Sequence, residues 1–197
     1  MKYLEVIALD QAANGLCQTV NGVRVDTVIE AFSCKPGSDK KLYKSMDHIY
    51  SDLATSPDPS VAQAISVSPF GPLSDTASRK TFIFLVATLN AVFPDYDFSD
   101  VKVEEFRHED NYFVVANGIN TPLASVFPQF SSEVQESMWK TVDREIDIKV
   151  PCSTFFVRFF FHVYYSVSLI SSSIQDCEIY SFLPDPDSDP FYEDGYL

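Results

Sequence analysis

Residues 71–99 read GPLSDTASRKTFIFLVATLNAVFPDYDFS, and this stretch predicts a long buried helix. The helix is expected to begin after Ser74 or Asp75, because either side chain can accept a free N–H group of the first turn. Residues 82–93 are apolar almost all round, which in a soluble protein is typical of a helix buried on most faces. Pro94 cannot continue a helix, so the predicted helix ends before it.

Two further helices are predicted from apolar spacing on either side of this stretch. Residues 40–53 carry apolar side chains at spacings of four, three and four, which places them on one helix face. Another helix opens at Ser132, and Gln135 three residues later completes a capping box. Trp139 lies beside the apolar stripe of that helix and is expected to belong to the core. The two stripes comprise Leu42, Met46, Ile49 and Leu53, and Val134, Met138, Val142 and Ile146.

Strands are predicted where β-branched and aromatic residues gather. Residues 113–116 and 178–182 have this composition, and Val23 to Phe32 predicts one strand or a bulged pair. Short links between strands favour antiparallel pairing. The sequence therefore predicts an α+β fold, α/β sandwich-like, in which a mainly antiparallel sheet is covered by helices. A length of 197 residues suits a single domain of this kind.

The overall charge narrows the class of partner. A formal net charge of −14 repels a phosphate backbone, so we expect a basic protein surface as partner and no direct contact with nucleic acid. A hydrophobic content of 46% argues against wholesale disorder. The four cysteines form no C-x-x-C pair, which excludes the ordinary zinc patterns and favours a reducing compartment, cytosol or nucleus.

No catalytic constellation is recognisable in the chain. His48, His108 and His162 are scattered, and the motifs of serine hydrolases, zinc proteases and nucleotide-binding loops are missing from the sequence. A small hydrolase would need a nucleophile and a base, and neither can be named. We therefore expect a protein that is not an enzyme and that uses no cofactor and no metal.

An acidic stretch near the end of the chain resembles a calcium loop only in part. Asp185, Asp187 and Asp189 match its first three ligand positions, but Pro190 replaces the required glycine and Tyr196 the bidentate glutamate. Two interpretations stay open for this stretch. It is either an acidic loop that meets a basic partner surface or a solvated charged loop.

The residues after the central helix carry the same ambiguity. Asp95, Tyr96 and Asp97, followed by Phe98, form either a turn that packs two aromatic rings inward or part of a docking surface. The two roles are compatible. Asp95, Tyr96 and Asp97 are therefore candidate partner-binding residues together with the three aspartates of the acidic stretch.

Residues 54–74 are rich in serine and proline, with few large apolar side chains, and predict a mobile linker. Ser56 and Ser68 each precede a proline in this linker and are candidate phosphorylation sites, where a phosphate adds about −1.5 to −2 charge. The paired basic residues Lys40-Lys41 and Arg79-Lys80 are weak indications of nuclear import.

Three blocks in a fixed order resemble the Maf-one family, the global repressors of RNA polymerase III transcription. They are the central stretch, IEAFSCK at 29–35, and CEIYSF at 177–182 with PDPDSDPF at 184–191. The resemblance implies a repressor that binds the clamp region of RNA polymerase III and blocks recruitment by the initiation factor under stress or nutrient limitation. It also implies control by kinases of the TOR and protein kinase A pathways, and shuttling between nucleus and cytoplasm.

Residues 150–175 have no counterpart in that resemblance, and three interpretations compete for them. Residues 153–174 are nearly long enough for a membrane helix, which would make the chain a membrane-anchored interaction protein, but Arg158 and His162 interrupt the run. The segment can also form a long buried strand pair. A retained intron accounts for more, because the codon of Val150 begins with GT and Gln175 can be encoded by CAG.

The resulting domain organisation has five parts. A retained intron over 150–175 would leave one Maf-one-like domain. The resemblance implies that its C-terminal part is truncated, because family members continue with a further aromatic strand after this point. The parts are 1–53 (N-terminal part of the domain), 54–74 (linker), 75–149 (central part), 150–175 (insertion) and 176–197 (C-terminal strand and acidic loop).

Overall fold

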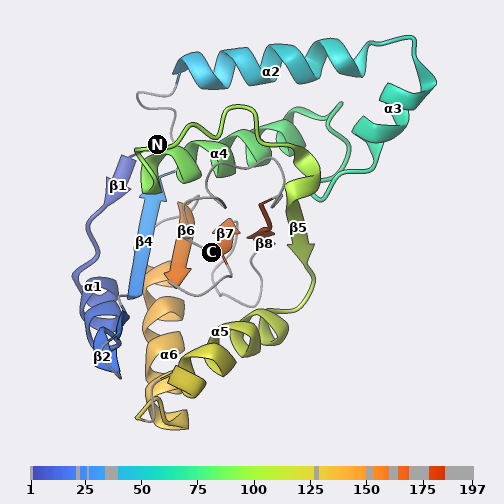
Figure 1. Cartoon of the computed structure of the whole chain (residues 1–197). Helices are drawn as coiled ribbons and strands as arrows, with labels where there is room; N and C mark the ends of the chain where they lie inside the picture. Colours follow the sequence, from blue (N-terminus) through green and yellow to red (C-terminus); the bar gives the residue numbers. More distant parts are fainter. Residues whose placement is uncertain are drawn as a thin grey trace.

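The structure is a computed structural model of the chain, and it describes residues 2–20, 23–25, 27–33, 40–126, 129–149, 153–159, 164–168 and 178–184. Six strands form an antiparallel sheet in the order β1-β4-β6-β7-β8-β5, and β2 pairs with β3 in a separate hairpin (Figure 1). The helices are α1 (Ile7–Asn14), α2 (Lys40–Ala54), α3 (Pro59–Ser66), α4 (Thr76–Val92), α5 (Tyr112–Val126) and α6 (Ser132–Lys149), with the short 3-10 helix η1 (Val103–Glu105). The strands are β1 (Lys2–Leu4), β2 (Gln18–Val20), β3 (Val23–Val25), β4 (Thr27–Ser33), β5 (Phe106–Glu109), β6 (Ser153–Phe159), β7 (Tyr164–Ser168) and β8 (Glu178–Phe182).

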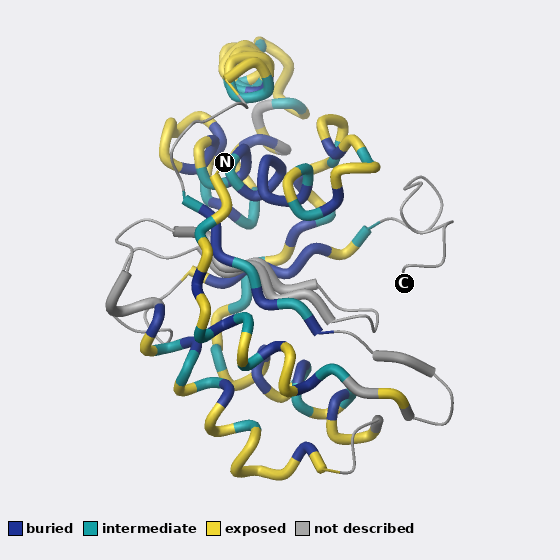
Figure 2. The backbone as a smooth tube through the Cα atoms, turned by 90° about the vertical axis from the view of Figure 1, so that its left-hand side faces the viewer, coloured by how far each residue is buried: buried dark blue, intermediate teal, exposed yellow. Residues whose placement is uncertain are grey.

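The sheet lies between two layers of helices, as the edge-on view in Figure 2 shows. Successive strand residues point to opposite faces, so neighbours on one strand enter different cores. Ala31 faces the core beneath α5 and α6, whereas Phe32 faces the core beneath α4. Ile179 and Tyr180 on β8 divide in the same way. This arrangement confirms the predicted α+β fold with a mainly antiparallel sheet covered by helices.

Helix α4 is the centre of the first core, which we call the α4 core. Phe82 is fully buried and packs against Phe70 and Phe106, with ring centroids 5.3 and 5.7 Å apart. Asp75 occupies the N-cap position without a side-chain cap hydrogen bond, and the helix ends at Val92. The predicted buried helix is thus confirmed in place and length. The α4 core comprises Phe32, Met46, Ile65, Phe70, Leu73, Phe82, Ile83, Leu85, Val86, Leu89, Phe93, Phe98, Val103, Phe106, Tyr180 and Phe182.

The second core lies on the other face of the sheet, and we call it the α5–α6 core. Residues 113–116 belong to its helix α5, so the strand predicted there is wrong. Asn111 starts this helix, since its side-chain oxygen accepts the Phe113 N–H at 2.8 Å. The α5–α6 core comprises Val6, Leu9, Ala13, Leu16, Ile29, Ala31, Val115, Ile119, Leu123, Phe130, Met138, Val142 and Ile179.

The other two predicted helices are confirmed, but their apolar stripes are only partly covered. In α2, Met46 is buried, whereas Ile49 and Leu53 keep 51% and 37% of their surface exposed. In α6, Met138 and Val142 are buried and Val134 is exposed. The cap of α6 also differs from the prediction, because the Val134 N–H donates to the hydroxyl of Ser131, one residue earlier.

The predicted mobile linker is ordered over much of its length. Helix α3 occupies residues 59–66, and Asp58 caps it by accepting the Ser60 N–H at 2.9 Å. Ile65, Phe70 and Leu73 are buried in the α4 core. The expectation of a mobile linker is therefore wrong over 59–73. Three well-spaced apolar side chains are enough to anchor this segment, although its composition is mostly serine and proline.

The segment expected to be an insertion contributes two strands to the middle of the sheet. Strand β6 pairs with β4 from Thr27↔Phe159 to Ser33↔Ser153, and β7 pairs with β8. Within the described ranges, no helix combines the length and apolar character needed to cross a membrane. Of the three interpretations, the strand pair matches the structure over 153–159 and 164–168. The retained intron concerns the transcript and stays a prediction.

Candidate functional site: an acidic face and groove beside α2

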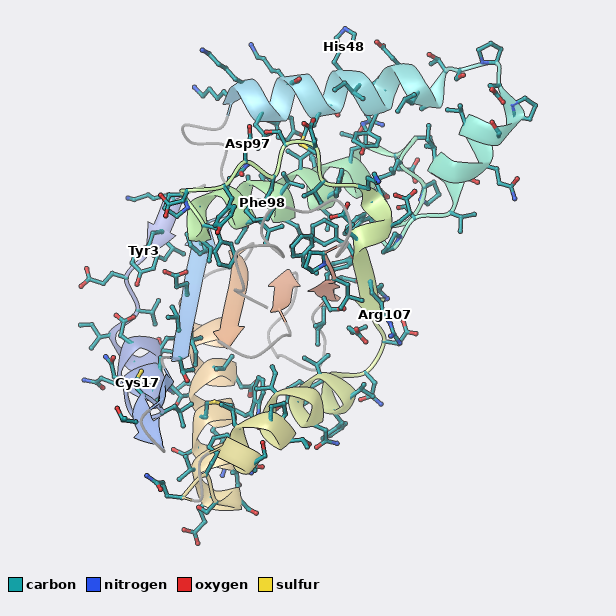
Figure 3. All side chains as sticks on the ribbon, in the orientation of Figure 1. Tyr3, Cys17, His48, Asp97, Phe98 and Arg107 are labelled. Carbon is teal, nitrogen blue, oxygen red and sulfur yellow. The ribbon has the colours of Figure 1, made fainter. Side chains whose placement is uncertain are left out.

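The segment after α4 carries most of the candidate partner-binding residues that the structure describes. It runs from Phe93 to Glu105 and crosses the α4 layer before entering β5; Figure 3 marks Asp97 and Phe98 on it. Phe93 and Phe98 are buried, 5.9 Å apart between ring centroids. The Phe98 N–H donates to the side-chain oxygen of Asn90 at 2.8 Å. These contacts fix the turn on the α4 core.

The turn role proposed for Asp95, Tyr96 and Asp97 is what the structure shows. Tyr96 is half-buried and packs against the α4 core, while both aspartates are exposed. Asp97 accepts hydrogen bonds from the hydroxyl and the N–H of Ser99, at 2.5 and 2.9 Å. These bonds lower the pKa of Asp97, the hydroxyl contributing most, so its carboxylate stays charged to a lower pH than usual. We call the exposed carboxylates of this segment the acidic face: Asp95, Asp97, Asp100 and Glu104.

A groove of about 360 Å³ lies beside the acidic face, between α2, α3 and residues 99–104. Its apolar base is formed by buried side chains, and Ile49 and Leu53 stand exposed at its edge. Tyr50 lines it as well, and burial, followed by the charge of Glu104, raises the pKa of its hydroxyl. The buried side chains of the base are Met46, Ile65, Leu73 and Val103.

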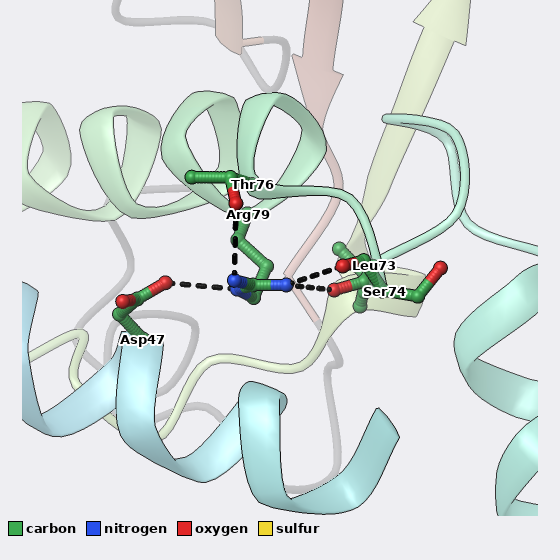
Figure 4. Close-up of polar contacts among 5 residues, drawn as sticks. All are labelled: Asp47, Leu73, Ser74, Thr76 and Arg79. Atoms are coloured by element: carbon green, nitrogen blue, oxygen red, sulfur yellow. Dashed lines mark hydrogen bonds and ion pairs between the residues drawn. The ribbon is translucent and has the colours of Figure 1, made fainter. Parts of the chain in front are cut away.

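A buried arginine fastens α2 to α4 next to this groove. Arg79 is 8% exposed, and its Nε donates to Asp47 Oδ1 at 2.8 Å (Figure 4). Its Nη1 donates to the carbonyl oxygens of Leu73 and Ser74, at 2.9 and 2.7 Å. Sequence reasoning noticed Arg79 only as half of a basic pair for nuclear import. The structure assigns its guanidinium to internal contacts, which the sequence around Arg79 does not indicate.

Both candidate phosphorylation sites lie in turns beside α3. The Ser56 hydroxyl accepts the Asp58 N–H at 3.3 Å at the corner between α2 and α3. The Ser68 hydroxyl donates to the carbonyl of Gly71 and accepts the Phe70 N–H at 3.2 Å. Gly71 has a φ of 86°, a conformation that suits glycine. Each serine therefore takes part in a turn rather than in an unstructured linker.

The remaining sequence candidates are not brought to this face. Asp185, Asp187 and Asp189 lie outside the described residues, as does His162. His48 pairs with Asp52 on α2 at 2.7 Å. Among the residues that the structure describes, no group of three or more histidine, cysteine, aspartate or glutamate side chains is arranged to hold a metal ion.

The remaining described histidine connects two strands at the edge of the sheet. His108 on β5 contacts Asp110 at 2.9 Å through Nδ1 and Glu178 on β8 at 2.7 Å through Nε2. The two carboxylates flank the ring, and the contact with Glu178 joins β5 to β8. The structure thus gives His108 a structural role.

A second groove, of about 530 Å³, lies on the opposite layer between α5 and α6. Trp139 is half-buried there; its indole N–H donates to the Asn120 side-chain oxygen at 3.1 Å, and its ring meets Tyr112 edge-on at 5.5 Å. Burial, with the charge of Asp143, raises the pKa of Tyr112 to about 12. Lys140 at the edge is paired with a neighbouring carboxylate at 2.6 Å. The prediction that Trp139 belongs to the core is confirmed in part, since it packs against the α5–α6 core.

Comparisons with known proteins support one family. A family model described as "Maf1 regulator" matches residues 25–158, which is more than half of the chain. The chain is 31% identical over 244 residues to a Dictyostelium discoideum protein named "Repressor of RNA polymerase III transcription", covering 100% of this chain and 77% of that protein. It is also 31% identical over 203 residues to "Repressor of RNA polymerase III transcription maf1" of Schizosaccharomyces pombe, covering 100% and 74%.

The fold agrees with this assignment. A crystal structure of citrus MAF1 superposes with a TM-score of 0.54 and 21% sequence identity, covering 89% of this chain and 96% of that chain. The three sequence blocks, the antiparallel sheet between two helical layers and the family-model match lead to the same result. The chain belongs to the Maf1 family, written Maf-one above.

Proposed function

We propose that this chain is a negative regulator of RNA polymerase III transcription that acts without catalysis. The observation that carries the proposal is membership of the Maf1 family, whose matched relatives from two organisms are named repressors of this transcription. The chain spans about three quarters of each of these relatives. The proposed partners are the clamp region of RNA polymerase III and the initiation factor that recruits the polymerase. Binding of the chain to the clamp would block this recruitment.

The acidic face suits this role on physical grounds. Asp95, Asp97, Asp100 and Glu104 are exposed on one ordered segment, and a fixed array of carboxylates steers a basic surface toward it. A folded body bound to the clamp excludes the initiation factor by its volume and charge. No bond has to be made or broken, so repression needs only tight and reversible binding.

The proposed regulation uses the turns next to α3. Kinases of the TOR and protein kinase A pathways would add a phosphate to Ser56 or Ser68, with about −1.5 to −2 charge each. A phosphorylated Ser68 can no longer donate to the carbonyl of Gly71, and a phosphorylated Ser56 places a dianion beside Asp58. Both changes loosen the α3 side of the groove. Shuttling between nucleus and cytoplasm is the proposed consequence in the cell.

The test of this function is reconstitution with purified components. The chain should retain RNA polymerase III in a pull-down and should reduce promoter-dependent transcription while leaving elongation from preassembled complexes unchanged. Both effects should weaken as salt rises, because salt screens exposed charges and largely cancels their interactions beyond about 10 Å at 0.1 M ionic strength. Normal transcription at saturating concentrations of the chain, with no polymerase retained, would contradict the proposal.

A further inference from the structure

Exposed apolar side chains of α2 form one edge of the groove. The apolar stripe of an amphipathic helix is ordinarily buried against the core. Within the apolar stripe of α2, Met46 is buried in the α4 core. Ile49 and Leu53 lie outside that core, and 51% and 37% of their surface is exposed. Exposed aliphatic groups beside a hollow of buried apolar side chains are typical of a surface that binds another protein.

The charges around this groove indicate the charge of the protein segment that it can bind. Asp100 and Glu104 line it from the segment after α4, and Asp52 and Asp58 lie on α2 and at the start of α3. Lys102 is the positively charged residue among the described residues that line it. The excess of carboxylates repels nucleic acid and anionic membrane surfaces, and attracts lysine and arginine.

The groove is also formed in advance of binding. The Leu73 N–H donates to the Ile65 carbonyl at 2.9 Å, which ties the end of α3 to the turn before α4. The contact of Arg79 with Asp47 holds α2 on the other side. Walls that are already fixed lose little conformational entropy on binding, so each apolar contact contributes more to affinity.

We propose that the groove between α2, α3 and residues 99–104 receives an apolar side chain from a basic segment of a protein partner. The inference rests on the proposed function, because the groove adjoins the acidic face, and it takes that partner to be RNA polymerase III. A hydrophobic anchor in a groove with a ring of complementary charge is the usual anatomy of a small, strong contact within a larger interface.

The decisive variant is Ile49→Asp, measured with purified RNA polymerase III. The dissociation constant should rise about tenfold or more, which corresponds to losing one strong anchor contact. The matched control is Val114→Asp, an exposed aliphatic residue at 58% exposure on α5, on the other helical layer. The control should bind within about twofold of the parent. Melting curves and a second variant, Ile49→Ala, separate lost contacts from lost folding, since alanine is expected to weaken binding less than aspartate.

Each outcome separates the two proposals. If the parent binds the polymerase and Ile49→Asp binds equally well, the groove proposal is overturned and the proposed function stands. If the parent does not bind the polymerase, the proposed function fails and the groove proposal fails with it. If Ile49→Asp and Val114→Asp weaken binding equally while both stay folded, the effect is not specific to the groove and the proposal is also overturned.

A photo-crosslinking residue tests the chemistry of the occupant directly. Benzoylphenylalanine replacing Leu53 should crosslink a polymerase segment in which an apolar residue has lysine or arginine within about one helical turn. The same probe at Val114 should give no such product. A crosslinked segment that is acidic, or crosslinking only from Val114, would overturn the proposal.

Discussion

The two helical layers on the sheet bury their apolar residues in different ways. In the α4 layer one helix is enclosed on nearly all sides, and aromatic rings fill the space around Phe82. In the other layer, α5 and α6 each bury one stripe of mostly aliphatic residues and expose the opposite side. The α4 layer therefore encloses its central helix more completely, and its outer helix α2 is left with an uncovered apolar end.

The surfaces of the two layers differ as well. Exposed carboxylates gather on the segment after α4, whereas α6 pairs Lys140 with Glu136 at 2.6 Å. A groove with an acidic edge and an open apolar stripe suits a basic protein partner. A groove whose edge charges are paired attracts a basic partner less strongly. The α5–α6 layer therefore serves as the control surface.

Phe82→Ala should produce the largest loss of stability. The ring is fully buried against Tyr50, Phe70 and Phe106, and removing it leaves a cavity, so the free energy of unfolding should fall by about 3–5 kcal/mol. Leu123→Ala in the α5–α6 core should cost less, about 2–3 kcal/mol, because fewer atoms are removed. Denaturant titration measures both, and a larger loss for Leu123→Ala would reverse the comparison of the two cores.

Arg79→Met should rank next and should act on the α4 layer alone. The change removes the ion pair with Asp47 and leaves the carbonyls of Leu73 and Ser74 without their donor, at a cost of about 3 kcal/mol. Lys140→Met, which breaks an exposed pair, should leave stability nearly unchanged. Hydrogen exchange should quicken in α2 and stay unchanged in α6, and uniform quickening would argue against a local role.

The helix caps give a smaller contrast between the layers. Asn111→Ala removes the side-chain oxygen that caps α5 and should cost about 1 kcal/mol. Asp75 occupies the corresponding position of α4 without a side-chain cap bond, so Asp75→Ala should cost less than half as much. Equal losses in thermal or denaturant unfolding would contradict the expected difference between the two caps.

Alkaline pH should lower stability through the partly buried hydroxyl of Tyr112. Burial raises the pKa of Tyr112 to about 12 in the folded protein, whereas the unfolded chain releases this proton near pH 10. The unfolded state therefore holds fewer protons above pH 10, and stability should fall as pH rises through the window from 10 to about 12. Tyr112→Phe should lessen this fall, as followed by the denaturant midpoint. An unchanged pH profile would show that Tyr112 is not shielded from water.

Much of this architecture follows from the sequence because the strongest patterns are also the most buried. The run at 82–93 has no polar side, and only a helix enclosed on most faces uses such a pattern. The β-branched and aromatic residues at 178–182 likewise predict the strand that the structure shows as β8. The β-branched residues at 113–116 favour a strand by composition, whereas Val115, Ile119 and Leu123 recur every four residues after a capping Asn111, as a helix requires.

Other features depend on contacts between distant parts of the chain. The composition of residues 54–74 predicts mobility. It contains no sign that Phe70 packs against Tyr180, with ring centroids 4.9 Å apart. The contact of Arg79 with Asp47 spans 32 positions and has no local signature. Within the candidate site, the sequence predicts the carboxylates at 95 and 97. The groove is not predictable in this way, because it forms only where α2, α3 and residues 99–104 come together.

We propose that the acidic face of the α4 layer binds RNA polymerase III, and a comparison of two pairs of charge reversals tests this proposal. Asp95→Lys with Asp100→Lys changes the formal net charge from −14 to −10, since each replacement adds two, and Glu5→Lys with Glu133→Lys makes the same change elsewhere on the surface. Affinity for the purified polymerase should fall about tenfold or more for the first pair, with a weaker salt dependence, and about twofold or less for the second. Equal affinities for the two charge-matched variants would contradict the claim.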